Sequence, residues 1–218
     1  MKYILNALIL CTVFSACSEN SNEHDIRVYD HAMNIGDLGV ATYAIHSIIA
    51  RDTSQTQFYD TLAGLYFNTG NFGQAGVTAE RVLRDQPNNQ RMLELAARSF
   101  QSVSRGPRAL HYFERLARLS NNPEHRYQVA AQLVYANKLT EAKEIASRLT
   151  TLPQGDSIKI VILSGETRQP VPIKAAAYNI LASIAYQQGN IQEAKEQISL
   201  ALAVFPEFIL AKQNLKNM

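Results

Sequence analysis

The sequence is poor in the residues that disulfides, thiol chemistry and metal centres require. Its 218 residues include two cysteines and no tryptophan. Cys11 lies inside an apolar run near the N-terminus, so Cys17 is the one cysteine outside that run, and a single thiol cannot form a disulfide within the chain. With 21 basic and 19 acidic residues the formal net charge is +2, which gives no electrostatic reason to expect a nucleic-acid partner.

A catalytic or metal-binding motif is also missing. The five histidines are scattered, and none forms a His-Glu-x-x-His pair. Ser164 follows a strand-like stretch but lacks the strand–elbow–helix setting of a nucleophilic serine. We therefore predict no catalytic residue, no metal site and no cofactor, and a chain that is not an enzyme. The alternative, an enzyme or an accessory subunit of an envelope enzyme, would need a site that no motif reveals.

The N-terminal segment is typical of an export signal. Lys2 is followed by a mostly apolar run over residues 3–14, which is too short to span a bilayer comfortably. The next residues, Ser15-Ala16-Cys17, resemble a bacterial lipobox, although Phe14 stands where that motif prefers Leu, Val or Ile. The resemblance implies a lipoprotein signal peptide over residues 1–16, a lipidated Cys17 and a polar tether over residues 17–25. An ordinary signal peptide or a short anchor helix are the alternatives.

The rest of the chain contains a repeated pattern of paired amphipathic helices. It is clearest in residues 175–208, where apolar residues recur at helical spacing, Gly189 interrupts them, and a second stripe runs to Pro206. A shift of 119 residues reproduces the pattern in residues 56–89. In residues 175–208, large apolar residues of one stripe face small ones of the other. The two stripes are Tyr178, Leu181, Ala182 and Ala185, then Ile191, Ala194, Ile198 and Ala201.

This pattern resembles the tetratricopeptide repeat (TPR), a helix–turn–helix unit of about 34 residues. The resemblance implies an all-α fold, an α-solenoid of about five TPR repeats with a C-terminal capping helix. We expect a degenerate first repeat at 22–55, then repeats at 56–89, 90–123, 124–153 and 175–208, and the cap at 209–218. The fourth repeat is one residue short, and we place the deletion in its turn near Asn137 and Lys138.

Residues 154–174 form an insertion between the fourth and fifth repeats. Residues 157–163 are β-branched and strand-like, whereas Pro170 and Pro172 restrict any returning strand to a short edge strand. The insertion is predicted to be a short β-hairpin or a loop. It either covers the helices or binds a partner.

The resemblance also implies a binding surface, because TPR ligands usually lie along the concave face built from first helices. Ile26 and Asp30 replace the residues of the family's carboxylate clamp, so a C-terminal carboxylate ligand is not expected. The alternative is a concave face that is merely solvated. Transferred position by position, the predicted peptide-binding residues are Phe67, Arg91, Arg98, Gln101, Gln128, Gln132, Tyr135, Asn179, Tyr186 and Gln187.

Together these features predict a lipid-anchored, non-catalytic interaction scaffold or adaptor of the bacterial cell envelope. We expect an outer-membrane lipoprotein facing the periplasm, or exposed at the surface, with protein partners, a lipid anchor, no nucleic acid and no small-molecule substrate. An assembly or pilotin-like factor for outer-membrane, pilus or secretion machinery is the alternative.

Overall fold

The computed structural model describes residues 19–218, with side chains from residue 22 onward. The predicted signal peptide and Cys17 lie outside the described residues. The described chain divides into two compact units, the first ending at Val103 and the second beginning at Ser104, and each is described by itself.

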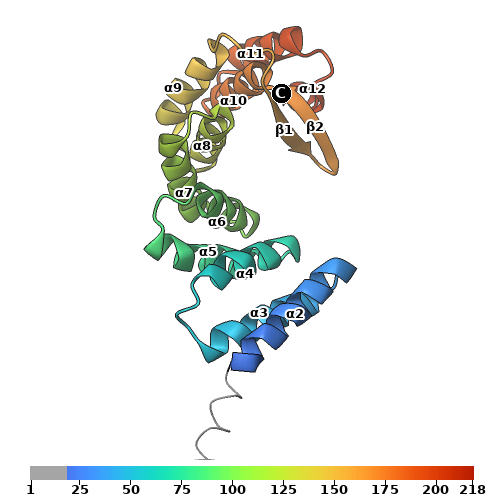
Figure 1. Cartoon of the computed structure of the whole chain (residues 1–218). Coiled ribbons are helices and arrows are strands. Elements are labelled where there is room, and N and C mark those ends of the chain that lie inside the picture. The colour runs from blue at the N-terminus through green and yellow to red at the C-terminus, as the bar shows by residue number, and fades with distance from the viewer. Residues whose placement is uncertain (1–18) are drawn as a thin grey trace, which may run out of the picture. The chain divides into compact units, whose positions relative to one another are not determined.

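The first unit contains consecutive antiparallel helices coloured from blue to green in Figure 1. Its polar loops begin helices through side-chain caps. Asp37 accepts a hydrogen bond from the Val40 backbone N–H, and Asn89 accepts one from that of Met92. The helices are α2 (Glu19–Ile35), α3 (Leu38–Arg51), α4 (Gln57–Asn68), α5 (Phe72–Asp85) and α6 (Gln90–Ser102).

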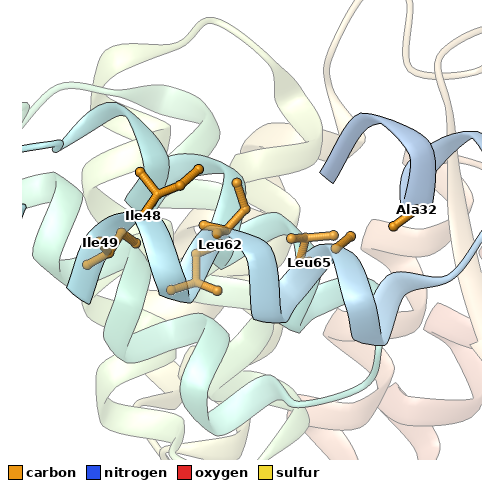
Figure 2. Packing of buried hydrophobic residues seen from close by; sticks show 7 residues of the cluster. Ala32, Ile48, Ile49, Leu62 and Leu65 are labelled. Carbon is orange, nitrogen blue, oxygen red and sulfur yellow. The ribbon is translucent and has the colours of Figure 1, made fainter. Parts of the chain in front are cut away.

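The core of the first unit lies where the apolar stripes of its helices meet. Ile48 and Ile49 of α3 pack against Leu62 and Leu65 of α4, with Ala32 of α2 close by (Figure 2). All five side chains are buried. Because no single helix could bury its own stripe, each helix depends on its neighbour, as the repeat pattern predicts.

The predicted tether is partly wrong, because residues 19–25 form the first turns of α2. Asp25 is only 7% exposed, and its carboxylate lies 2.6 Å from a guanidinium nitrogen of Arg51 in α3. The sequence suggested a tether because Glu23, His24 and Asp25 form a polar run. Two of these three side chains point to solvent, and the third pairs with the neighbouring helix.

The second unit contains further helix pairs and a two-stranded sheet. Its helices are α7 (Gly106–Leu119), α8 (Pro123–Tyr135), α9 (Leu139–Thr150), α10 (Ile173–Gln187), α11 (Ile191–Val204) and α12 (Ile209–Lys216). The strands β1 (Lys159–Ser164) and β2 (Thr167–Pro172) follow α9 in the sequence, pair antiparallel and lie beside α10 and α12 (Figure 1). The predicted all-α repeat fold, with a helical cap and a small insertion, is confirmed.

The turns inside the first, second, fourth and fifth helix pairs have one recurring geometry. In three of these turns a glycine with positive φ ends the first helix, and in the fourth repeat Asn137 takes the same conformation. A backbone N–H then donates to a carbonyl five residues earlier, as from Asn71 to Tyr66 at 2.8 Å and from Lys138 to Leu133 at 2.9 Å. Asn137 therefore marks the same turn position that Gly36, Gly70 and Gly189 mark in their repeats.

This geometry corrects the position of the one-residue deletion in the fourth repeat. The left-handed residue stands 14 positions after the repeat start in the second and fifth repeats, at Gly70 and Gly189. In the fourth repeat Asn137 is 13 positions after the predicted start at 124, and 14 after Pro123, where α8 begins. The turn has its full length, and the missing residue lies in the loop of residues 120–122 between α7 and α8.

The hairpin is fixed to the cap by specific bonds. Ile160, Ile162 and Val171 are buried on the side of the sheet that faces the helices. The Gln169 amide donates to the Glu207 carbonyl at 2.6 Å, and its oxygen accepts from the Ile209 N–H at 3.0 Å. The insertion is thus an ordered part of the second unit. Within residues 19–218, no helix has both the length and the apolarity that crossing a membrane requires.

Candidate functional site

The candidate site is a concavity in the second unit that is walled by α8, α10 and α12. It consists of two adjoining hollows of about 230 and 280 Å³ that share Ser183 and Asn214. The first hollow is also lined by Tyr127, Ala131, Val134, Tyr135, Asn179, Ile180 and Leu210, and the second by Tyr186, Gln187, Asn217 and Met218.

The side chains on α8 reach this concavity because of the corrected register. Counted from Pro123, repeat positions five, nine, twelve and thirteen are Tyr127, Ala131, Val134 and Tyr135, and all four line the first hollow. On α10 the same positions are occupied by Asn179, Ser183, Tyr186 and Gln187, and these also line the two hollows. The concavity is therefore built from equivalent positions of successive first helices.

An amide pair connects two walls of the site. The Asn214 side chain on α12 donates from Nδ2 to Oδ1 of Asn179 on α10 at 2.9 Å. Within the described chain, the Asn179 amide N–H groups and the Asn214 amide oxygen have no further hydrogen bond. A free amide NH2 group and a free amide oxygen thus remain next to each other, which matches the alternating N–H and C=O groups of an extended peptide.

The side chains that line the site are uncharged. None of its lining side chains is a carboxylate, ammonium, guanidinium or imidazole. Burial raises the pKa of Tyr127 strongly, and the neighbouring Tyr135 adds a smaller effect in the same direction. Tyr127 therefore stays a neutral phenol, and Tyr135 presents an aromatic ring that is 83% exposed. Phenols and amides can bond polar backbone groups while the rings contact apolar side chains.

The predicted residues of the second unit are not all placed alike. Tyr135, Asn179, Tyr186 and Gln187 line the concavity. Gln132 is only 5% exposed and lies outside the lining, because the register slip moved this prediction by one position. Gln128 is half-buried and does not line the site either. Sequence reasoning missed Tyr127, Ala131 and Val134 for the same reason. Alignment of Asn137 with the turn glycines of the other repeats is the signal that could have given the correct register.

The predicted residues of the first unit lie on α4 and α6. Gln101 is exposed, Arg91 is ion-paired with Asp60, and the Arg98 guanidinium lies 2.8 Å from the carboxylate of Glu94. Phe67 is half-buried, with its ring 5.3 Å from that of Phe72 in an edge-to-face contact. That these residues bind a peptide stays a prediction, as does a single surface shared with the second unit.

Two larger hollows have a different character. One of about 460 Å³ lies between α7, α8 and α9, with an apolar floor and a rim of three arginines and three glutamates, of which Arg148 and Glu144 are paired. The other, of about 440 Å³, lies on α2 and α3 and includes His24 and His31. Neither is built from equivalent positions of successive first helices. In the described part of the chain, no three His, Cys, Asp or Glu residues are grouped so that they could hold a metal ion.

Solved structures with this fold are TPR proteins. YrrB, described as a TPR protein with an unusual peptide-binding site, has a TM-score of 0.70 at 19% identity, covering 93% of this chain and 97% of its own. A TPR protein from Parabacteroides merdae has a TM-score of 0.68 at 14% identity, covering 90% and 72%. MamA has a TM-score of 0.65 at 13% identity, covering 85% and 92%. No protein-family model and no curated protein sequence matches the chain.

Proposed function

Because the chain has the tetratricopeptide-repeat fold, we propose that it is a non-catalytic interaction scaffold that binds an extended protein segment. The observation that carries this proposal is the neutral concavity of the second unit, where repeat-equivalent side chains of α8 and α10 face the cap helix α12. YrrB, a structural neighbour described as having a peptide-binding site, lends support from the same fold.

The chemistry of the site favours an uncharged segment. A ligand carboxylate or ammonium would lose its hydration there without meeting an opposite charge on a lining side chain, which costs several kcal/mol. Backbone amides meet the free donor and acceptor of Asn179 and Asn214 instead. Apolar side chains can pack on the rings of Tyr135 and Tyr186. We therefore expect an extended, uncharged stretch with apolar side chains.

The second part of the proposal is a lipid anchor in the cell envelope. Cys17 after Ser15 and Ala16, preceded by an apolar run, supports lipidation, and the mature chain then begins at that cysteine. Ser18, directly after the cysteine, supports an outer-membrane lipoprotein that faces the periplasm. Stable anchoring requires two acyl signals or more, since a single chain binds only marginally.

A displayed library of random peptides tests the binding site. Selection on the purified chain should yield sequences that lack charge in their central residues. Tyr135→Ala should weaken binding of the selected peptides by about thirtyfold, because truncation of a hot-spot tyrosine typically costs ~2 kcal/mol. Leu119→Ala, an exposed apolar residue of α7 outside the site, is the control. Peptides that bind both variants equally would place the site elsewhere.

Metabolic labelling with a fatty-acid analogue tests the anchor separately. The wild-type chain should be labelled and Cys17→Ser should not. Equal labelling of both would refute lipidation at Cys17 and leave the peptide-binding proposal untouched.

A further inference from the structure

The hairpin has one open edge. The Ile173 N–H donates to the Ile158 carbonyl at 2.8 Å, so this pair is hydrogen-bonded, and hydrogen-bonded pairs then alternate along the register. Lys159, Val161 and Leu163 fall in the non-hydrogen-bonded pairs, and their backbone N–H and C=O groups point away from β2. Among residues 19–218, no hydrogen bond engages these outward groups.

The other edge is closed by proline. Pro170 and Pro172 stand opposite Val161 and Lys159, so their nitrogens also point outward. Neither has an N–H, which leaves Arg168 as the one remaining outward donor among these three residues of β2. Prolines at such positions cost no bond of the β1–β2 ladder but prevent another strand from pairing there. A strand can therefore add to β1 and not to β2.

The solvent face beside the open edge has a definite chemistry. Val161 and Leu163 are 52% and 64% exposed, although large apolar side chains on an edge strand invite association. Lys159 and Arg168 lie on the same face, and in the described chain neither has an ion pair. The outward-facing residues of the two strands therefore combine apolar and positive side chains and include no acid.

We propose that β1 binds an extended segment of a partner protein as a third strand of the sheet. The segment carries apolar residues opposite Val161 and Leu163 and a carboxylate opposite Lys159. A second copy of this chain fits less well, because pairing β1 with itself would gather four unpaired cations on one face. This site differs from the neutral concavity in position and in charge, and its existence does not depend on that of the concavity.

The binding of a blocked hexapeptide, Val-Thr-Val-Thr-Glu-Thr, to the full-length chain tests this proposal by fluorescence anisotropy. In a third strand, alternate residues turn their N–H groups toward β1. N-methylation of the third residue should weaken binding by about tenfold, because it removes one edge hydrogen bond and adds a clash, whereas N-methylation of the fourth should leave it unchanged. Equal binding of the two methylated peptides, or no binding of the parent peptide, would overturn the proposal.

Protein variants give an independent reading. Val161→Pro removes an outward N–H of β1 without removing a ladder bond and should abolish binding, whereas Val161→Thr keeps the N–H and the β-branch and should preserve it. Lys159→Glu should weaken binding of the parent peptide and strengthen binding of the peptide that has Lys in place of Glu. If Val161→Pro perturbs the hairpin by circular dichroism, the pair of methylated peptides still decides the question. A dimer in sedimentation that Val161→Pro dissociates would assign the edge to a second copy and contradict a foreign segment.

Discussion

Asn179 of α10 and Asn214 of α12 share a hydrogen bond of 2.9 Å across the concavity of the second unit. Through this bond the capping helix does more than cover an apolar end, because it forms one wall of the candidate site. Phe208, at the start of α12, is fully buried and holds this wall in place. Stability of the cap and binding in the concavity should therefore change together.

Phe208→Ala should detach α12. Removing a fully buried phenylalanine typically costs about 3–5 kcal/mol, and a short helix that loses its main apolar contact is left without support. Hydrogen exchange should become faster in α12 and at Asn179. Phe205→Ala, a half-buried neighbour, is the control and should have a smaller effect. Equal protection of α12 in the wild type and in Phe208→Ala would contradict this role.

Two glycines of α5 should respond to alanine with opposite signs. A Cβ at Gly76 would lie 2.8 Å from the buried ring of Phe100 in α6, whereas a Cβ at Gly73 meets nothing within 4 Å. Gly76→Ala should destabilise by about 1–3 kcal/mol, since the ring cannot move freely in the core. Gly73→Ala should stabilise by roughly 0.4–1 kcal/mol, because Gly73 has no positive φ in the first turn of α5 and alanine reduces the conformational freedom of the unfolded chain. Urea unfolding followed by circular dichroism measures both, and a Gly76→Ala variant as stable as Gly73→Ala would show that the two helices are not packed this closely.

Asp25 tests whether α2 begins before the predicted end of the tether. Asp25→Ala removes the carboxylate that pairs with Arg51 and should destabilise the first unit by about 1 kcal/mol, as Arg51 is partly exposed. Glu23→Ala, which affects an exposed pair with Arg27 on the same helix, should have almost no effect. Identical thermal unfolding of the two variants would indicate that residues 19–25 are a tether and not part of α2.

Tyr127 should make the second unit sensitive to alkaline pH. Burial raises the pKa of Tyr127 in the folded chain, so above pH ~10, the ordinary pKa of tyrosine, the unfolded chain loses this proton first. The stabilising contribution is complete below pH ~10 and is lost progressively as the pH rises further. Tyr127→Phe should show a smaller loss of stability between pH 9 and about 11 in urea unfolding. The same slope in both proteins would mean that Tyr127 is not buried as described.

Much of the fold could be predicted because helix periodicity and turn glycines are local signals. Tyr178, Leu181, Ala182 and Ala185 fixed one face of a helix, and Gly189 fixed its end. Asn137 was harder to interpret, because asparagine adopts the left-handed conformation less often than glycine, so the missing residue was assigned to the turn. That one-residue error moved Gln132 into the predicted site and Tyr127 out of it.

The remaining part of the site depends on contacts between distant segments. Asn214 lies 35 residues after Asn179, and no local pattern indicates that their amides meet. The ion pair of Asp25 with Arg51 is of the same kind, since a lone acid in a polar run has no periodic signature. The open edge of the hairpin could be identified only from the pairing register of β1 and β2. That register, and not the composition, determines that the nitrogens of Pro170 and Pro172 point outward.

Site-specific photocrosslinking in cells that produce the protein tests the central claim most directly. A benzophenone amino acid is placed at Tyr135 in the concavity, and in separate variants at Arg118 in the charged hollow and at Val161 on the hairpin. We predict a crosslink from Tyr135 to a protein partner, mapped by mass spectrometry to an uncharged, extended segment, and lost when unlabelled segment is added in excess. Crosslinks to the partner from Arg118 alone, with none from Tyr135, would contradict binding in the concavity.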